Sequence, residues 1–372
     1  MTLVWGASAT EVLVLLMCGF AGGAFGAAIG ALPAFVFTGL MVIAGEAANS
    51  FAAASQGLLP AAAIPETAAG ITYGLGFGPV FGPHVAFAGG VAAAAYAAKH
   101  DGMPEPSDGE FHPAKDIGYA LGTSPDVLAV GGAFGMLGVV IRRTSQFTLT
   151  LPIDPPAMGV ILTAVVARLV FGYPLVGTAG GSSLLDMGPF EQGKRRTATD
   201  SGEAATDGGT ATSYRPAVEP WLPHQYRWSG VAAVGLVSGL LGGYIAIVTG
   251  SAVFAFGVSA TSLLFLNLGV EKFPVTHHMT LPGSFVAIML TTPATETSAA
   301  VAGMGQPAAL ALAAVAGGVG ALLGEVVQRV FYAHSDTHFD PPAGSIILTT
   351  LTLGVLALLG LLPGIANIPG TL

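Results

Sequence analysis

The sequence predicts an all-α integral membrane protein built from two homologous halves, and three observations support this prediction. Hydrophobic residues make up 52% of the 372 residues and charged residues only 9%, whereas roughly a quarter of the residues in soluble proteins are charged. Long stretches such as residues 12–45 and 228–270 contain no Asp, Glu, Lys or Arg, although about 20 apolar residues suffice for one membrane-spanning helix. The third observation is an internal repeat. Together they exclude a water-soluble globular enzyme.

The repeat is the most specific signal in the sequence. Residues 131–163 match residues 317–349 at a constant separation of 186, without a gap and with 13 identities in 33 positions. The identities include the run Asp-Pro-Pro-Ala, which begins at Asp154 and again at Asp340. A weaker match at a separation of 220 aligns glycines near the start of each half. Such self-similarity indicates an internal duplication.

A polar segment, residues 187–227, separates the two halves. Its central part is rich in Glu, Lys, Arg, Thr, Asp and Gly and holds almost no large apolar residue, so we expect it to be a flexible linker. The chain then divides into a first membrane repeat, residues 1–186, this linker, and a second membrane repeat, residues 228–372.

Length and hydropathy predict the individual helices of the second repeat. There are five of them, at Trp228–Val248, Ala252–Leu268, Thr276–Leu290, Pro307–Phe331 and Pro342–Leu362. Duplication of an odd number of spans places the second copy upside down, which gives the inverted repeats of many secondary transporters. We therefore expect about 10 transmembrane helices, within a range of about 9 to 12, in two inverted repeats.

The basic residues give conflicting information about orientation. Arg142 and Arg143 follow one predicted helix, and Lys194, Arg195 and Arg196 lie in the linker. Both groups favour the cytoplasmic side, yet one predicted helix separates them. Either the helix after Pro155 is re-entrant or one basic group lies outside the cell.

Four charged residues of the repeat are candidates for ion coupling. Asp154 and Asp340 each precede a Pro-Pro pair, a pattern typical of a helix N-cap followed by proline in the first turn. The alternative is that they form a symmetry-related pair of ion or proton ligands. Glu325 and Arg329 are spaced to pair on one helix, either as an interfacial ion pair or as part of the coupling site.

The sequence His-Ser-Asp-Thr-His-Phe-Asp places His334, Asp336, His338 and Asp340 at every second residue. In an extended conformation these side chains share one face, and imidazoles with carboxylates suit a divalent cation. A polar loop at the membrane surface explains the same pattern without a metal.

A candidate substrate site lies where an apolar helix ends in Thr291, Thr292 and Pro293, and three further hydroxyls follow at Thr295, Thr297 and Ser298. A broken helix exposes backbone N–H groups, and neighbouring hydroxyls complete a cradle for a carboxylate. An ordinary turn between helices, capped by Thr and Ser, is the alternative interpretation.

Three segments resemble the large membrane subunit of the tripartite tricarboxylate transporters. They are Gly26–Pro33, with its Gly-rich helix ending in Leu-Pro, Gly70–Gly74, and Ala287–Ala300, with its Thr-Pro helix break. The resemblance implies an inverted-repeat, cation-driven carboxylate permease that works with a solute-binding protein and a small membrane subunit. It also points to the helix break at Gly30 and Pro33 as the other half of the substrate site. The chain departs from the family pattern at Ala34 and Ala294, where the family has Gly after Pro.

The sequence thus predicts a multi-pass protein of the cell membrane that is not an enzyme and transports a small anionic solute, coupled to Na⁺ or H⁺ and without a resident cofactor. The alternatives are a passive Gly-lined channel and a metal-dependent membrane enzyme that uses the His334–Asp340 segment. The net charge of -9 gives no reason to expect a nucleic-acid partner, and the acidic, lysine-poor composition is typical of a high-salt organism. A homo-oligomer is compatible with the sequence.

Overall fold

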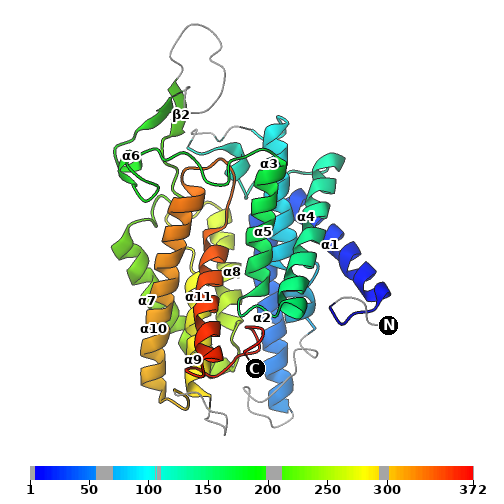
Figure 1. The fold of residues 1–372 in the computed structure, drawn as a ribbon, viewed down its shortest axis with the longest axis vertical. Helices are drawn as coiled ribbons and strands as arrows, with labels where there is room; N and C mark the ends of the chain where they lie inside the picture. Colours follow the sequence, from blue (N-terminus) through cyan, green and yellow to red (C-terminus); the bar gives the residue numbers. More distant parts are fainter. Residues whose placement is uncertain are drawn as a thin grey trace.

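The computed structural model describes residues 5–55, 70–104, 106, 110–197, 212–292 and 301–371. Long helices run side by side in this part of the chain, with a β-hairpin at one end of the bundle (Figure 1). The main helices are α1 (Ala9–Ile29), α2 (Ala31–Ser55), α3 (Ala88–Lys99), α4 (Pro125–Arg143), α5 (Pro155–Val170), α7 (Trp228–Thr249), α8 (Phe254–Asn267), α9 (His277–Thr291), α10 (Gln306–Val327) and α11 (Pro341–Leu358). Shorter elements are the π-helical turns η3 (Thr72–Gly76), η4 (Pro83–Phe87), η6 (Thr144–Thr148) and η7 (Gln328–Tyr332), the 3-10 turn η5 (Pro113–Lys115) and the helix α6 (Gly188–Glu191).

The prediction of an all-α fold is confirmed. Within the described residues, six helices are long and apolar enough to cross a membrane, namely α1, α2, α4 with η6, α7, α10 with η7, and α11. Helices α5 and α8 are apolar but shorter. All five helices predicted in the second half are present, with ends that differ from the predicted ones by a few residues. Local signals explain the ends: Gly250 closes α7 in a left-handed conformation, with φ 69°, and proline begins α11.

The two Asp-Pro-Pro helices run in opposite directions. The backbone N–H of Asp154, at the start of α5, donates to the hydroxyl of Thr350, in the second half of α11 (2.9 Å). Arg168, near the end of α5, donates to the hydroxyl of Thr337, just before α11 begins (2.8 Å). Helices α5 and α11 are therefore antiparallel, and the helices that precede them, α4 and α10, are antiparallel as well.

Both described ends of the chain lie at one end of the bundle (Figure 1). The indole N–H of Trp5 donates to the hydroxyl of Thr144 (3.2 Å), and Gly370 lies against Thr150. We call this the terminal end. The opposite end carries the described parts of the linker, residues 187–197 and 212–227, and we call it the linker end.

Glycines allow very close helix packing in each half. A Cβ on Gly23 of α1 would overlap the carbonyl oxygen of Gly131 in α4, and a Cβ on Gly239 of α7 would overlap Gly317 in α10. The backbones of each helix pair are thus in direct contact, as expected for helices that associate in lipid.

The described parts of the linker contain regular secondary structure. Its two described parts contain α6 and the antiparallel strands β1 (Arg195–Thr197) and β2 (Thr212–Pro216), with Arg195 paired to Pro216. Residues 217–227 continue over the bundle, where Glu219 is buried. Ion pairs join these parts to the connection between α3 and α4 and to the segment that precedes α11.

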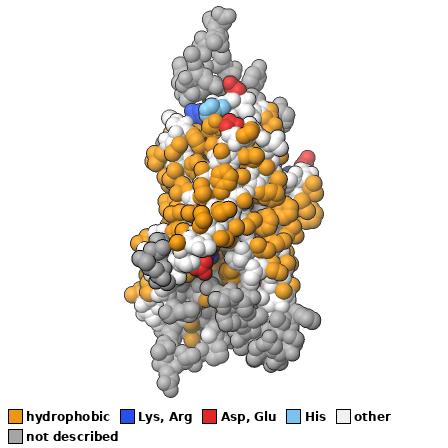
Figure 2. Space-filling view, turned by 90° about the vertical axis from the view of Figure 1, so that its right-hand side faces the viewer, with side chains coloured by type: hydrophobic (Ala, Val, Ile, Leu, Met, Phe, Trp, Pro, Cys, Tyr) orange, Lys and Arg blue, Asp and Glu red, His pale blue; other side chains and the backbone are white. Residues whose placement is uncertain are grey.

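The outer surface of the bundle is apolar around its middle. Hydrophobic side chains cover the central part of the face in Figure 2, and charged side chains gather near the hairpin. On α7, for example, Val237, Leu241, Tyr244 and Val248 are all more than half exposed. Exposed apolar area of this extent on several helices suits contact with lipid acyl chains.

Candidate functional site: a central cavity beneath a charged lid

A cavity of about 630 Å³ lies between the two halves of the bundle. Helices of both halves form its walls, because Leu32 and Phe35 of α2 face residues such as Leu263 of α8 and Leu281 of α9. Residues from α5 and α11, including Val160 and Ile346, complete the apolar lining. The volume is in the range of sites for small molecules.

Polar residues lie at both ends of this cavity. At the linker end they are Glu110, Lys115, Asp116, Lys194 and Arg195. Toward the terminal end they are Arg142, Gln146, Asp154 and Asn367. The cavity is therefore apolar along most of its walls and polar at its two ends, as is usual for ligand pockets that orient a solute with few polar groups.

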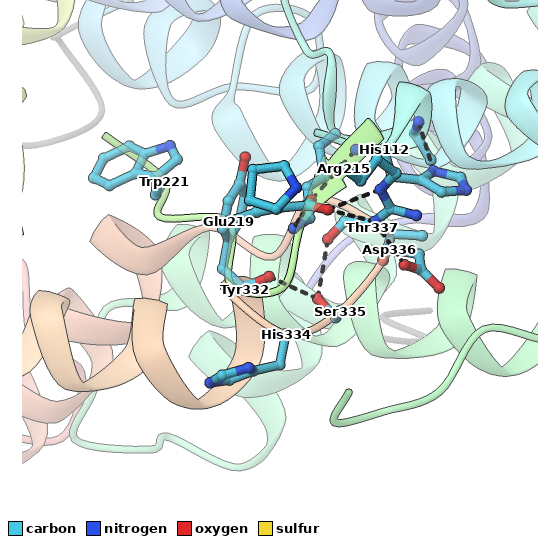
Figure 3. A network of polar contacts seen from close by, with 12 residues as sticks. His112, Arg215, Glu219, Trp221, Tyr332, His334, Ser335, Asp336 and Thr337 are labelled. Carbon is cyan, nitrogen blue, oxygen red and sulfur yellow. Dashed lines mark hydrogen bonds and ion pairs between the residues drawn. The ribbon is translucent and has the colours of Figure 1, made fainter. Parts of the chain in front are cut away.

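A buried carboxylate organises the linker end (Figure 3). Glu219 is 1% exposed, and its carboxylate lies 2.6 Å from the Lys115 ammonium and 2.7 Å from the Arg215 guanidinium. Arg215 and Arg196 also pair with Asp336, at 2.9 and 3.2 Å. This network joins the α3–α4 connection, the β-hairpin and the segment after α10, so it holds the linker over the cavity as a lid.

The charges of the network stabilise one another. Burial acts to raise the pKa of Glu219, but Lys115, Arg215 and Arg196 hold this pKa below its ordinary value. Burial lowers the pKa of Lys115 to about 8, although Glu219 opposes the change. Both partners are therefore charged at neutral pH. An unpaired charge at such a depth is strongly unfavourable, which explains why several opposite charges surround each group.

Two further arginines bind loops at the linker end. Arg168 is 1% exposed and donates to Thr337, Ser335 and the carbonyl oxygens of Leu175, Phe331 and Thr337. Arg329 donates to Glu325 at 2.6 Å, which confirms the predicted pairing, and to the carbonyl oxygens of Leu185, just before the linker, and Tyr226, within it. Since backbone groups satisfy most of these donors, both arginines fix the structure of the linker end.

The capping role of the repeated aspartates is confirmed. The carboxylate of Asp154 accepts from the N–H of Ala157, and that of Asp340 accepts from the N–H of Ala343, both at 2.7 Å. Asp154 and Asp340 also line the central cavity. A helix cap does not need to line a cavity. The position of both carboxylates is thus compatible with a second role as ion or proton ligands.

The four candidate metal ligands do not come together. His334 binds the backbone of Gly180 and Leu184, Asp336 pairs with arginines, and His338 contacts Asp340. The segment turns at Ser335, whose N–H donates to the carbonyl of Tyr332, so its side chains do not share one face. Among the described residues, no group of three or more His, Cys, Asp or Glu side chains has a geometry that holds a metal ion.

The two parts of the predicted substrate site lie far apart. Gly30 and Pro33 are at the linker end, where Gly30 lies next to Gly118 and Leu32 donates to Ile117. Thr291 and Thr292 end α9 on the opposite side of the bundle, since 15 helical residues span roughly 22 Å. Both hydroxyls bond back to carbonyls of α9. Thr295, Thr297 and Ser298 lie outside the described residues.

Sequence reasoning missed Lys115, Arg215 and Glu219, the centre of the lid network. Lys115 and Glu219 are 104 residues apart, so no local pattern joins them. One signal was available, because Lys115 is one of few lysines in a chain with 12 basic residues and follows a proline in an otherwise polar loop. The glycines, in contrast, serve mainly in helix contacts: only Gly118 and Gly193 line the cavity in the described structure.

No curated protein and no solved structure matches this chain at a significant level. A family model, in contrast, matches residues 5–371, which is nearly the entire sequence. The match includes both halves of the bundle and the linker between them, so the cavity and its charged lid belong to one family unit. The protein is a member of DUF7973, a family of unknown function.

Proposed function

We propose that this protein is a cation-coupled secondary permease for a small anionic solute. The observation that carries the proposal is the central cavity between two halves whose corresponding helices run in opposite directions. Transporters built from inverted repeats bind their solutes at such an interface, near the middle of the membrane. At the linker end, Lys194 and Arg195 supply positive charge for an anion, while Lys115 already pairs with Glu219.

The proposal includes ten spans in two inverted repeats of five. The contacts of the halves support it: α1 packs on α3 and α4 as α7 packs on α9 and α10. His84 in η4, just before α3, contacts Gly138, and His278 at the start of α9 contacts Gly324. These two glycines are separated by 186 residues, the spacing of the sequence repeat. In this arrangement α3, together with η3 and η4, forms one interrupted span.

The distribution of basic residues favours a cytoplasmic linker end. Arg142 and Arg143 are near the terminal end. All other Lys and Arg residues of the chain are at the linker end. They lie in the linker itself, in side chains that contact the linker, or in connections between helices at that end. The positive-inside rule then places the linker in the cytoplasm and the terminal end outside. This orientation removes the conflict between the two basic groups without a re-entrant helix after Pro155.

Coupling and partners extend the proposal. Asp154 and Asp340 are the best candidates for ligands of Na⁺ or H⁺, because both carboxylates line the cavity. A solute-binding protein and a small membrane subunit would dock at the extracytoplasmic, terminal end.

Uptake into vesicles tests the transport function. The purified protein is reconstituted, and accumulation of labelled small carboxylates is measured under imposed Na⁺ or H⁺ gradients. Accumulation that follows one gradient and disappears with an ionophore supports the permease. Flux that ignores every gradient and does not saturate contradicts it. The variant Asp154→Asn/Asp340→Asn, which retains both caps, should lose gradient-driven uptake if these carboxylates bind the coupling ion.

A further inference from the structure

The wall of the central cavity contains a continuous row of aromatic rings that crosses the bundle. At the linker end, the ring of Tyr332 lies 5.4 Å from that of His338, which lies 5.6 Å from Phe87. Phe87 contacts Phe35 at 5.7 Å, and Phe35 contacts His277 at 4.9 Å. All of these residues line the cavity.

The row continues toward the terminal end. Phe35 lies 5.9 Å from Phe256, Phe256 lies 5.5 Å from Phe77, and Phe77 lies 5.9 Å from Tyr73. The hydroxyl of Tyr73 accepts a hydrogen bond from Asn367. Each half of the chain supplies four of the eight rings, so the row is a property of the interface between the halves.

Two histidines give this apolar wall unused hydrogen-bonding capacity. The Nδ1 atoms of His277 and His338 are buried and have no hydrogen-bond partner within the described structure. A buried polar atom without a partner costs about 1–3 kcal/mol. A solute that brings a polar group to either ring therefore recovers part of this cost, while its apolar part remains against the phenylalanines.

The linker end of the row carries charges of both signs, because the carboxylates Glu110, Asp116 and Asp340 line the cavity there together with three cations. The ammonium of Lys115 lies 4.5 Å above the ring of Tyr332, and Lys194 and Arg195 line the same end. Asp116 and Asp340, which also line the cavity, accept backbone N–H groups with their carboxylates. Lys115 already pairs with Glu219, whereas Lys194 is exposed and lines the same end. A solute carboxylate is thus favoured beside Lys194 and an aromatic body beside Phe35 and Phe256.

We propose that the cavity binds an aromatic carboxylate, with its ring along this row and its carboxylate toward Lys194. This inference rests on the proposed function and specifies the solute of the same site. A solute with three carboxylates fits less well, because the middle of the cavity offers aromatic rings and no Lys or Arg side chain among the residues that line it.

Binding to purified protein in lipid nanodiscs tests this assignment. The probe is labelled phenylacetate, with acetate, citrate, decanoate, phenethylamine and neutral phenylacetamide as competitors and empty nanodiscs as the blank. We expect phenylacetate to bind at least about tenfold more tightly than acetate, citrate or phenylacetamide, since ring contacts and one charge pair each contribute about 1 kcal/mol. Citrate, decanoate or phenethylamine binding as tightly as phenylacetate would overturn the assignment.

Variants on one helix provide a matched comparison. Phe256→Leu on α8 keeps an apolar side chain and removes a ring of the row, whereas Phe265→Leu changes a ring on the same helix that is 51% exposed and lies outside the cavity. We expect Phe256→Leu to weaken phenylacetate binding about fivefold and Phe265→Leu to leave it unchanged. Equal effects of both variants, or none of either, contradict the row as a binding surface.

Lys194→Gln tests the position of the carboxylate. This variant should weaken phenylacetate binding and leave phenylacetamide binding unchanged; equal loss for both contradicts the predicted orientation.

Binding and uptake together separate the two proposals. Phenylacetate that binds but is never accumulated contradicts the permease alone. Gradient-driven uptake of citrate without any phenylacetate binding contradicts the aromatic solute alone.

Discussion

The corresponding segments α4–η6–α5 and α10–η7–α11 have the same backbone plan. In each, a long helix ends in a π-helical turn, a connection follows, and an Asp cap with two prolines begins the next helix. The two cap hydrogen bonds have the same length, 2.7 Å. What the two segments share is therefore the geometry of their helix ends.

The polar chemistry of the two segments differs. Arg329 pairs with Glu325, binds carbonyls of Leu185 and Tyr226, and stacks on Trp228. Its counterpart Arg143 lies 5.1 Å above Phe147, and Val139 stands where the second half has Glu325. The described parts of the linker pack against the end of the bundle that holds Arg329, so identical arginines have different contacts.

The largest expected effect concerns the backbone plan common to both halves. Gly239→Val and Gly23→Val each place a side chain where another helix backbone lies, which should cost more than about 4 kcal/mol and prevent folding. Size-exclusion chromatography of detergent extracts should show little monodisperse protein for either variant. Gly230→Val is the control, because nothing lies within 4 Å of its Cβ position. A well-folded Gly23→Val protein would mean that the two halves are not packed alike.

The next largest expected effect is a difference in the free energy of unfolding between variants of Arg329 and Arg143. Arg329→Met leaves Glu325 buried without its partner, and loss of one member of a buried pair costs about 3–5 kcal/mol. Arg143→Met removes a contact with one ring, which is worth about 1 kcal/mol or less. Denaturant-induced unfolding in detergent micelles measures both. Similar losses would show that Arg143 has a role beyond its contact with Phe147.

The aspartate caps should differ little between the halves. Asp154→Ala and Asp340→Ala each remove one cap hydrogen bond and should reduce the free energy of unfolding by about 1 kcal/mol. The Asn variants keep the cap and should be close to the native protein, with Asp340→Asn slightly less stable because His338 contacts Asp340. Thermal unfolding measures these changes. An Asn variant as unstable as the Ala variant would refute the capping explanation.

The helices were predictable because their signals are local. The predicted Thr276–Leu290 helix and the observed α9, His277–Thr291, differ by one residue at each end, since an apolar run between polar loops sets both limits. The ion pair of Glu325 and Arg329 was predictable for the same reason, because a helix brings residues four apart together.

The site was not predictable in the same way. Phe35 and Phe256 read in sequence as ordinary apolar residues of a span, and only the packing of α2 against α8 turns them toward one cavity. The metal pattern failed because it assumed an extended segment, whereas Ser335 lies in a turn. Residues that are more than a hundred positions apart form no local sequence pattern, so the sequence does not indicate that they contact each other.

The smallest expected effect is a pH dependence specific to the linker end. Burial lowers the pKa of His112 to about 4, from an ordinary value near 6.5, and its neutral Nδ1 accepts from the N–H of Ala114. Between pH 4 and 6.5, His112 is protonated in the unfolded chain and neutral in the folded protein. The contribution of this residue to stability is therefore complete above about pH 6.5 and decreases as the pH falls toward 4.

From pH 7 to pH 6 this residue should account for a loss of roughly half a kcal/mol. His112→Asn retains an acceptor for Ala114 and removes the titration, so the difference in unfolding free energy between the variant and the native protein should shrink as the pH falls over this range. His100→Asn is the comparison, since His100 is an exposed histidine. If the difference in unfolding free energy between His112→Asn and the native protein does not change with pH, the lid does not require the neutral form of His112. The carboxylates of Glu219 and Asp336 would then stabilise the protonated ring in the folded protein.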